Sequence, residues 1–192
     1  MENYSKAIEY FKKALAKEPN NTDIMYYIAL AYSNNDDITN AKTYIKKAIA
    51  LTKSDEKIKE LNNYIVETDK NQQLEKAFEL YEKNNLTQAL TILNTLIAED
   101  SKNAHAYFYR AMVFDAQKKY QDAINNYLNS VKYTNDLNVA YYSIGVDYDY
   151  LKNYNQAVNY YKKYLSTNPT EQEYIDFVNN RIKELKPYVS KK

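Results

Sequence analysis

A pattern of aromatic and small residues recurs every 34 residues along the chain. Within residues 140–165, side chains follow the three-and-four spacing of one helix face, stop near Lys152, and then resume. The recurring residues are Tyr141, Gly145, Tyr148, Tyr154, Ala157 and Tyr161, and their counterparts 34 positions earlier are Tyr107, Ala111, Phe114, Tyr120, Ala123 and Tyr127. A fixed period of this length predicts a stack of similar units, each a hairpin of two helices.

The scarcity of turn-forming residues supports the same fold class. The 192 residues include one glycine and three prolines, which leaves little material for β-hairpins or phosphate-binding loops. The sequence therefore predicts an all-α protein.

The aromatic and small residues that recur at these fixed positions resemble the pattern of the tetratricopeptide repeat, a 34-residue helix-turn-helix unit. Residues 104–137 and 138–171 match well, residues 22–55 match through their small and apolar slots, and residues 70–103 match more loosely. The resemblance implies a right-handed α-solenoid of antiparallel helix hairpins, a TPR superhelix.

The period is interrupted once, because Ala41 and Ala89 are 48 residues apart, which is one repeat plus 14. The additional segment, residues 55–68, is similar to the C-terminal segment, and a solenoid needs a polar-faced helix at its end. We therefore expect an N-terminal domain, residues 1–69, with a half repeat, one full repeat and an internal capping helix. Residues 70–186 are expected to hold three repeats and a C-terminal cap, followed by a tail at 187–192. The internal cap either continues as one long helix or kinks near Asp69.

The composition argues against catalysis and against several classes of ligand. The chain has no cysteine and a single histidine, His105, so thiolate chemistry and two-histidine metal sites are excluded, and we expect no metal and no cofactor. Asp147 and Asp149 lie two apart on a helix and point to different faces, which makes them a poor catalytic pair. The net charge of +1 does not favour nucleic acid. The prediction is that the protein is not an enzyme.

No apolar run is long enough to cross a bilayer, and the N-terminus lacks the pattern of a signal peptide. We therefore expect no membrane insertion and a cytoplasmic location, with other compartments open if an upstream targeting segment was removed.

In proteins with this repeat, the first helix of each pair lines a concave face that receives a peptide or a helix. The resemblance therefore implies a protein-protein interaction scaffold that binds an apolar or aromatic segment in this groove. The matching residues are Tyr26, Tyr27, Leu30, Phe78, Tyr81, Phe108, Tyr109, Met112, Asp115, Tyr142, Val146, Asp149 and Tyr150. The two acids leave a basic segment open as an alternative. Tyr142 and Tyr150 are the strongest candidates for ligand contacts, because they lie off the apolar stripe.

Two other functions remain open: a self-assembling structural subunit, and a secretion or assembly chaperone that shields a client segment. The chain also begins in the second helix of a repeat, so one flank of that helix should lack its usual cover. The residues on this flank are Tyr4, Ile8, Phe11 and Leu15. We expect either a fragment of a longer array or a homodimer formed through this edge.

Overall fold

The computed structural model describes residues 4–52 and 55–189, which form ten α-helices, one short 3-10 helix and no strand. The helices are α1 Tyr4–Lys17, α2 Thr22–Ser33, α3 Ile38–Leu51, α4 Glu56–Glu82, α5 Leu86–Glu99, α6 Ala104–Ala116, α7 Tyr120–Tyr133, α8 Val139–Tyr150, α9 Tyr154–Ser166 and α10 Gln172–Leu185, followed by η1 Lys186–Tyr188. The all-α prediction is confirmed. Part of the expected tail, residues 190–192, lies outside the described residues.

The chain divides into two compact units, Met1–Gln72 and Gln73–Lys192. In the first unit, α1, α2, α3 and the first half of α4 bury one apolar cluster, in which Ile28, Ile45 and Ile65 have no exposed surface. Ile58 and Leu61 of the expected internal cap also belong to this cluster. That this unit ends as an independent folding module stays a prediction.

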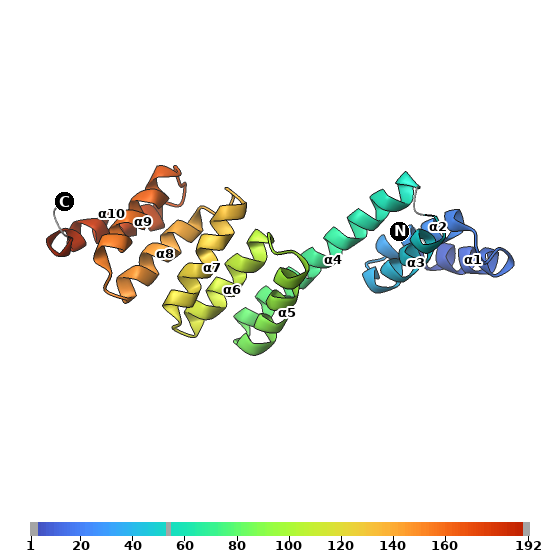
Figure 1. Cartoon of the computed structure of the whole chain (residues 1–192), viewed down its shortest axis with the longest axis horizontal. Helices are drawn as coiled ribbons and strands as arrows, with labels where there is room; N and C mark the ends of the chain where they lie inside the picture. Colours follow the sequence, from blue (N-terminus) through green and yellow to red (C-terminus); the bar gives the residue numbers. More distant parts are fainter. Residues whose placement is uncertain (1–3, 53–54, 190–192) are drawn as a thin grey trace. The chain divides into compact units, whose positions relative to one another are not determined.

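The second unit is a stack of helix hairpins. Figure 1 shows α6 with α7 and α8 with α9 as successive antiparallel pairs, and α7 also packs against α8. Tyr161 is completely buried, and Tyr141, Tyr148 and Tyr154 pack partly buried against the same clusters. These rings fill the space between hairpins, as the sequence indicates.

One small residue at each hairpin crossing faces one large residue of the following helix. Gly145 of α8 lies against the ring of Tyr161 of α9, and a Cβ atom at position 145 would be only 2.5 Å from Cδ1 of that ring. Earlier in the chain, the equivalent small residue is a completely buried alanine, Ala29, Ala77 or Ala111. The small side chain lets two helix backbones approach closely.

The segment between the two units is a single helix. Helix α4 continues through Asp69, so no new helix begins there, as the alternative of one long helix predicts; whether α4 bends near Asp69 stays a prediction. The carboxylate of Asp69 forms an ion pair with Lys42 of α3, at 2.6 Å.

The N-terminal edge is less open than the sequence suggests. Ile8 is only 7% exposed, and Phe11 stacks on Tyr27 of α2 with ring centroids 5.6 Å apart. Leu15 is partly buried against the same cluster. The expectation of an uncovered flank is therefore wrong for Ile8, because α2 covers this side of α1. Self-association through Tyr4, Ile8, Phe11 and Leu15 stays an untested prediction.

The turn inside each hairpin contains a residue with positive φ, and none of these residues is glycine. They are Asp36, Asn84, Lys118 and Lys152, with φ between 57° and 58°. In each case the next residue donates its backbone N–H to the carbonyl five positions back, as Asn153 does to Tyr148 at 2.8 Å. This geometry is that of a Schellman C-cap, in which glycine is the usual residue.

Replacing Lys152 by Gly should stabilise the protein by about 0.5–1 kcal/mol, because a left-handed conformation is costly for a residue with a Cβ atom. Thermal unfolding followed by circular dichroism measures the change. Lys162 is exposed in the middle of α9, so Lys162→Gly serves as the control and should destabilise by about 1 kcal/mol. Equal melting temperatures for Lys152→Gly and the wild type would show that the left-handed conformation of Lys152 does not lower the stability of the protein.

Candidate functional site

None of the residues predicted to line the groove is fully buried. Tyr27 and Tyr150 are the most open, at 47% and 64% exposed, and the others are partly buried. In the second unit, these residues come from the end of α4, from α6 and from α8. In the first unit, they come from α2, where the rings of Tyr26 and Tyr27 meet edge to face at 5.3 Å. The first helix of each hairpin thus carries large side chains that its neighbours cover only in part.

Aromatic rings link α4 to α6 within the second unit. Phe78 lies 5.4 Å from Tyr109 and 6.0 Å from Tyr81, measured between ring centroids. Phe108 contacts both Tyr109 and the buried ring of Tyr127. The predicted groove residues here form a continuous aromatic strip whose underside is packed against the second helices.

Tyr142, predicted as a leading ligand contact, lies in a separate aromatic cluster. Its ring is 4.8 Å from Tyr174, 5.7 Å from Phe177 and 5.7 Å from Tyr164. The first two belong to α10, so the C-terminal cap covers part of this tyrosine. Sequence reasoning treated α10 only as a cap and therefore missed its two aromatic residues.

Tyr150, the other leading candidate, forms the wall of a small pocket. Its ring stacks on Tyr120 at 4.8 Å with an interplanar angle of 3°. The pocket has a volume of about 290 Å³. Its lining residues are Asp115, Ala116, Lys118, Tyr120, Tyr142, Ser143, Val146, Asp147 and Tyr150. We call this the α6–α8 pocket.

Two carboxyl groups meet in the α6–α8 pocket. Asp115 accepts a hydrogen bond from the hydroxyl of Tyr127 at 2.8 Å, and Asp147 is only 2% exposed. Burial, followed by the hydrogen bond and charge of Asp115, raises the pKa of Asp147, so that its neutral form donates to Asp115. Burial also raises the pKa of Asp115. The pair therefore holds a proton at neutral pH.

Sequence reasoning missed the pairing of Asp115 with Asp147. The two residues are 32 positions apart, so they do not occupy equivalent slots of the repeat. The available signal was that Asp147 lies 34 residues after Val113, a completely buried position. A carboxyl group in an apolar slot needs a partner within the core.

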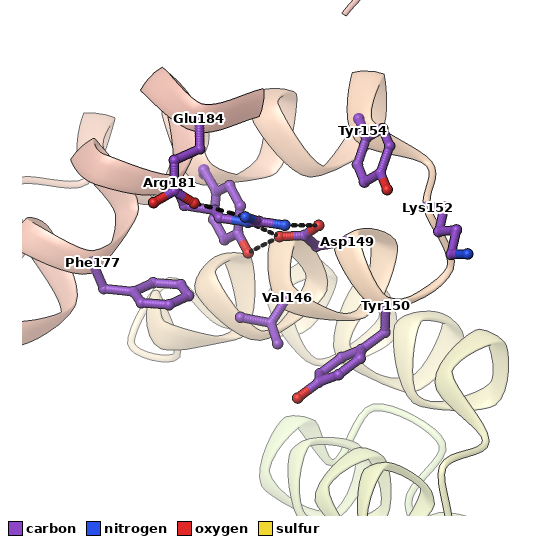
Figure 2. Close-up of a pocket in the computed structure, with 9 residues that line it drawn as sticks. Val146, Asp149, Tyr150, Lys152, Tyr154, Phe177, Arg181 and Glu184 are labelled. Carbon is purple, nitrogen blue, oxygen red and sulfur yellow. Dashed lines mark hydrogen bonds and ion pairs between the residues drawn. The ribbon is translucent and has the colours of Figure 1, made fainter. Parts of the chain in front are cut away.

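Asp149 is held by an ion pair that the sequence did not reveal. Arg181 of α10 donates to both of its carboxylate oxygens, at 2.5 and 2.9 Å, and the Tyr161 hydroxyl lies 3.5 Å away (Figure 2). Glu184 binds the same guanidinium at 2.7 Å. These hydrogen bonds raise the pKa of Arg181. The charge of Asp149 is therefore compensated within the protein.

A second pocket, of about 480 Å³, surrounds this ion pair. In Figure 2, Val146 and Phe177 lie on one side of Asp149, and Tyr154 and Lys152 on the other. The pocket combines apolar walls with a charge pair that is already satisfied. It offers an apolar surface more than a free charge.

Among the described residues, no helix combines the length and the apolarity that crossing a lipid bilayer requires.

Three family models match the chain, at residues 1–61, 74–136 and 139–171, and each describes a tetratricopeptide repeat. The chain belongs to the tetratricopeptide repeat family. This family and the helical fold identify it as a protein-interaction scaffold in the general sense, with another protein as the partner.

Three proteins to which the chain is similar share 16–23% identity with it. The chain is 23% identical over 180 residues to a DnaJ homolog subfamily C member 7 homolog from Dictyostelium discoideum, which covers 86% of this chain and 33% of that protein. The chain thus spans about a third of the length of this relative. Among solved structures, the TPR domain of P58(IPK) has a TM-score of 0.58 at 17% identity, covering 97% of this chain and 61% of that one. YrrB, described as a TPR protein with an unusual peptide-binding site, has a TM-score of 0.47 at 16% identity, covering 90% and 82%.

The carboxyl pair predicts a specific dependence of stability on pH. Because the pKa of Asp147 is raised to about 9 in the folded protein, the folded state holds a proton that the unfolded state releases above about pH 4. The unfolding free energy should therefore fall as the pH rises from 5 to 8, by at most about 1.4 kcal/mol per pH unit for this group.

Asp147→Asn should remove this loss, because the amide is neutral at every pH and can donate to Asp115. The variant's melting temperature relative to the wild type should rise between pH 5 and pH 8, as measured by circular dichroism. Asp122→Asn, an exposed position on α7, is the matched control and should show no such trend. A pH-independent difference for Asp147→Asn would show that the two carboxyl groups do not share a proton.

Proposed function

We propose that this protein is a non-catalytic scaffold that binds an apolar or aromatic segment of a partner protein, as a peptide or a helix, on its first-helix face. In the second unit this face is the aromatic strip formed by Phe78, Tyr81, Phe108 and Tyr109. The observation that carries the proposal is that these large side chains stay partly exposed, although the crossings beneath them are closed by residues such as Ala111 and Tyr127.

The contacts of the strip favour binding for a physical reason. Phe78 and Tyr109 touch each other, and Phe108 rests on Tyr127, so the rings have little rotational freedom left to lose on binding. Their remaining exposed surface is apolar, with a phenolic hydroxyl on Tyr109 that can form a hydrogen bond. Aromatic anchors of this kind account for much of the binding energy in protein interfaces.

The two alternatives, a self-assembling subunit and a chaperone for a client segment, stay predictions. A self-assembling subunit would change its size with concentration, whereas a scaffold for a different protein would not. The partial cover of Ile8, Phe11 and Leu15 by α2 reduces the apolar surface that the N-terminal edge could offer to a second copy.

Selection from a library of random linear peptides displayed on phage, with the full chain as the target, provides the test. Selected peptides should be rich in apolar and aromatic residues. Tyr109→Ala and Phe78→Ala should each weaken the binding of a selected peptide by about 1–3 kcal/mol, measured by isothermal titration calorimetry.

Tyr10→Ala is the control for this experiment, because Tyr10 is an exposed tyrosine on α1 outside the strip. This variant should bind the peptide as the wild type does, and all three variants should keep the helical content of the wild type. If peptides bind equally well to Tyr109→Ala and Phe78→Ala, the strip is not the binding site.

A further inference from the structure

We propose that the pocket around Arg181, which we call the α8–α10 pocket, binds an aromatic side chain of the partner segment, with the ring stacked on the Arg181 guanidinium. This inference rests on the proposed function and extends its first-helix face onto the C-terminal cap, α10. The occupant is an uncharged planar ring, as in phenylalanine, tyrosine or tryptophan. The pocket volume of about 480 Å³ accommodates one such side chain and lies within the range of small-molecule sites, about 300–1,000 Å³.

The charges that line the pocket cancel, which favours an uncharged occupant. They are two acids, Asp149 and Glu184, and two bases, Arg181 and the exposed Lys152. Arg181 donates to both oxygens of Asp149 and also to Glu184 (Figure 2). A cation would have to displace Arg181 from Asp149, and an anion would have to displace Asp149 from Arg181. Either exchange breaks a bidentate contact, which is among the stronger hydrogen-bonding arrangements in proteins, whereas a neutral group leaves it intact.

The hydrogen bonds of Arg181 use the edge of its guanidinium and leave the flat faces. Nε and Nη2 donate to Asp149, and Nη1 donates to Glu184, so all three nitrogens are engaged within the plane of the group. The faces of a guanidinium are weakly hydrated and stack on aromatic rings. The Arg181 side chain lines the pocket and is 32% exposed. A planar ring therefore gains a stacking contact here without competing for a hydrogen bond.

The second arginine of the chain already makes a contact of this kind. The chain has two arginines, and the guanidinium of Arg110 lies over the ring of Tyr107, 5.3 Å from the ring centroid. The edge of this guanidinium donates to the side chains of Asn126 and Asn94. Arg181 has similar edge contacts, but its guanidinium has no cation–π contact with a ring of the described residues. A ring from a partner would complete the same arrangement at Arg181.

Apolar walls complete the site from both helices. Val146 of α8 and Phe177 of α10 lie on one side of the ion pair, and Tyr154 lies on the other (Figure 2). The Phe177 side chain is 43% exposed, although its ring contacts the buried ring of Tyr161 edge to face at 6.3 Å. This contact restricts the Phe177 ring, so little freedom is left to lose on binding. An incoming ring would cover the exposed part of Phe177 and gain an aromatic contact beyond the burial of apolar area.

The test uses N-acetyltryptophanamide as the probe, titrated into the full nitrogen-15-labelled chain and followed by NMR. The two arginines give two Nε–H signals, which the variant Arg181→Lys assigns. We expect a saturable upfield shift of the Arg181 signal, because the ring current shields a proton that lies over a ring face. The Arg110 signal should stay in place. The dissociation constant should be on the order of 1 mM for so small a probe.

Three further titrations define the occupant. N-acetylleucinamide is apolar but has no ring, and it should bind at least about threefold more weakly, measured at the amide of Val146. n-Butylammonium and acetate, at matched ionic strength, should produce no saturable shift there. If the Arg181 signal instead moves with protein concentration in the absence of a probe, the occupant is a second copy of the chain, and the inference is overturned.

Variants assign the stacking to Arg181. Arg181→Lys keeps a positive charge beside Asp149 but removes the planar face, so it should weaken probe binding at the Val146 amide by about threefold or more. Arg110→Lys is the matched control and should leave the affinity unchanged. If Arg181→Lys does not fold, Phe177→Ala replaces it, because it removes a partly exposed ring, and it should also weaken binding by about threefold or more. Unchanged affinity in the folded variant, or no saturable shift of the Arg181 signal in the wild type, would overturn the inference.

The outcome is separable from that of the proposed function. Peptides selected on the full chain should contain an aromatic residue whose replacement by leucine weakens binding to the wild type but not to Arg181→Lys. Peptides that need Tyr109 but bind Arg181→Lys as tightly as the wild type would retain the scaffold function and overturn the aromatic site at the α8–α10 pocket. Failure to select any peptide, together with the expected shift of the Arg181 signal by N-acetyltryptophanamide, would instead support the pocket and contradict the proposed function.

Discussion

The close crossing of the two helices in each hairpin is the constraint on which the rest of the structure depends. A residue without a long side chain, Ala111 in one hairpin and Gly145 in another, lets the second helix place a large buried ring, Tyr127 or Tyr161, into the crossing. Because interiors are packed to near crystal density, this arrangement fixes the spacing and rotation of both helices. The rotation in turn decides which side chains of the first helix remain at the surface.

The candidate sites follow from that rotation. On α6, Phe108 and Tyr109 are left partly exposed and form the aromatic strip with Phe78. On α8, Asp147 is turned into the core, where its partner is Asp115 of the preceding hairpin. The packing of the crossings therefore decides both which rings stay partly exposed and which carboxyl group is buried.

Much of the fold follows from the 34-residue period, because residues at equivalent positions make equivalent packing contacts in each repeat. Interactions that break the period could not be predicted in this way. Arg181 binds Asp149 from 32 residues away, in a helix that is not a full repeat, and Asp115 and Asp147 occupy different slots. The period does not predict the conformation of the turns either, since Lys152 adopts the left-handed conformation that glycine favours. The partial exposure of the groove residues was predictable from the repeat, but the residues that pair with Asp115 and Asp149 were not.

Gly145→Ala tests the crossing most directly, because helix propensity and packing predict opposite outcomes. Alanine favours a helix interior over glycine by about 1 kcal/mol, whereas a Cβ atom at this position would meet the completely buried Tyr161 ring at 2.5 Å. We expect a lower melting temperature for Gly145→Ala, and a smaller loss when the same change is made beside Tyr161→Leu, the residue found at the equivalent position 93. A melting temperature that rises with Gly145→Ala alone would contradict the account.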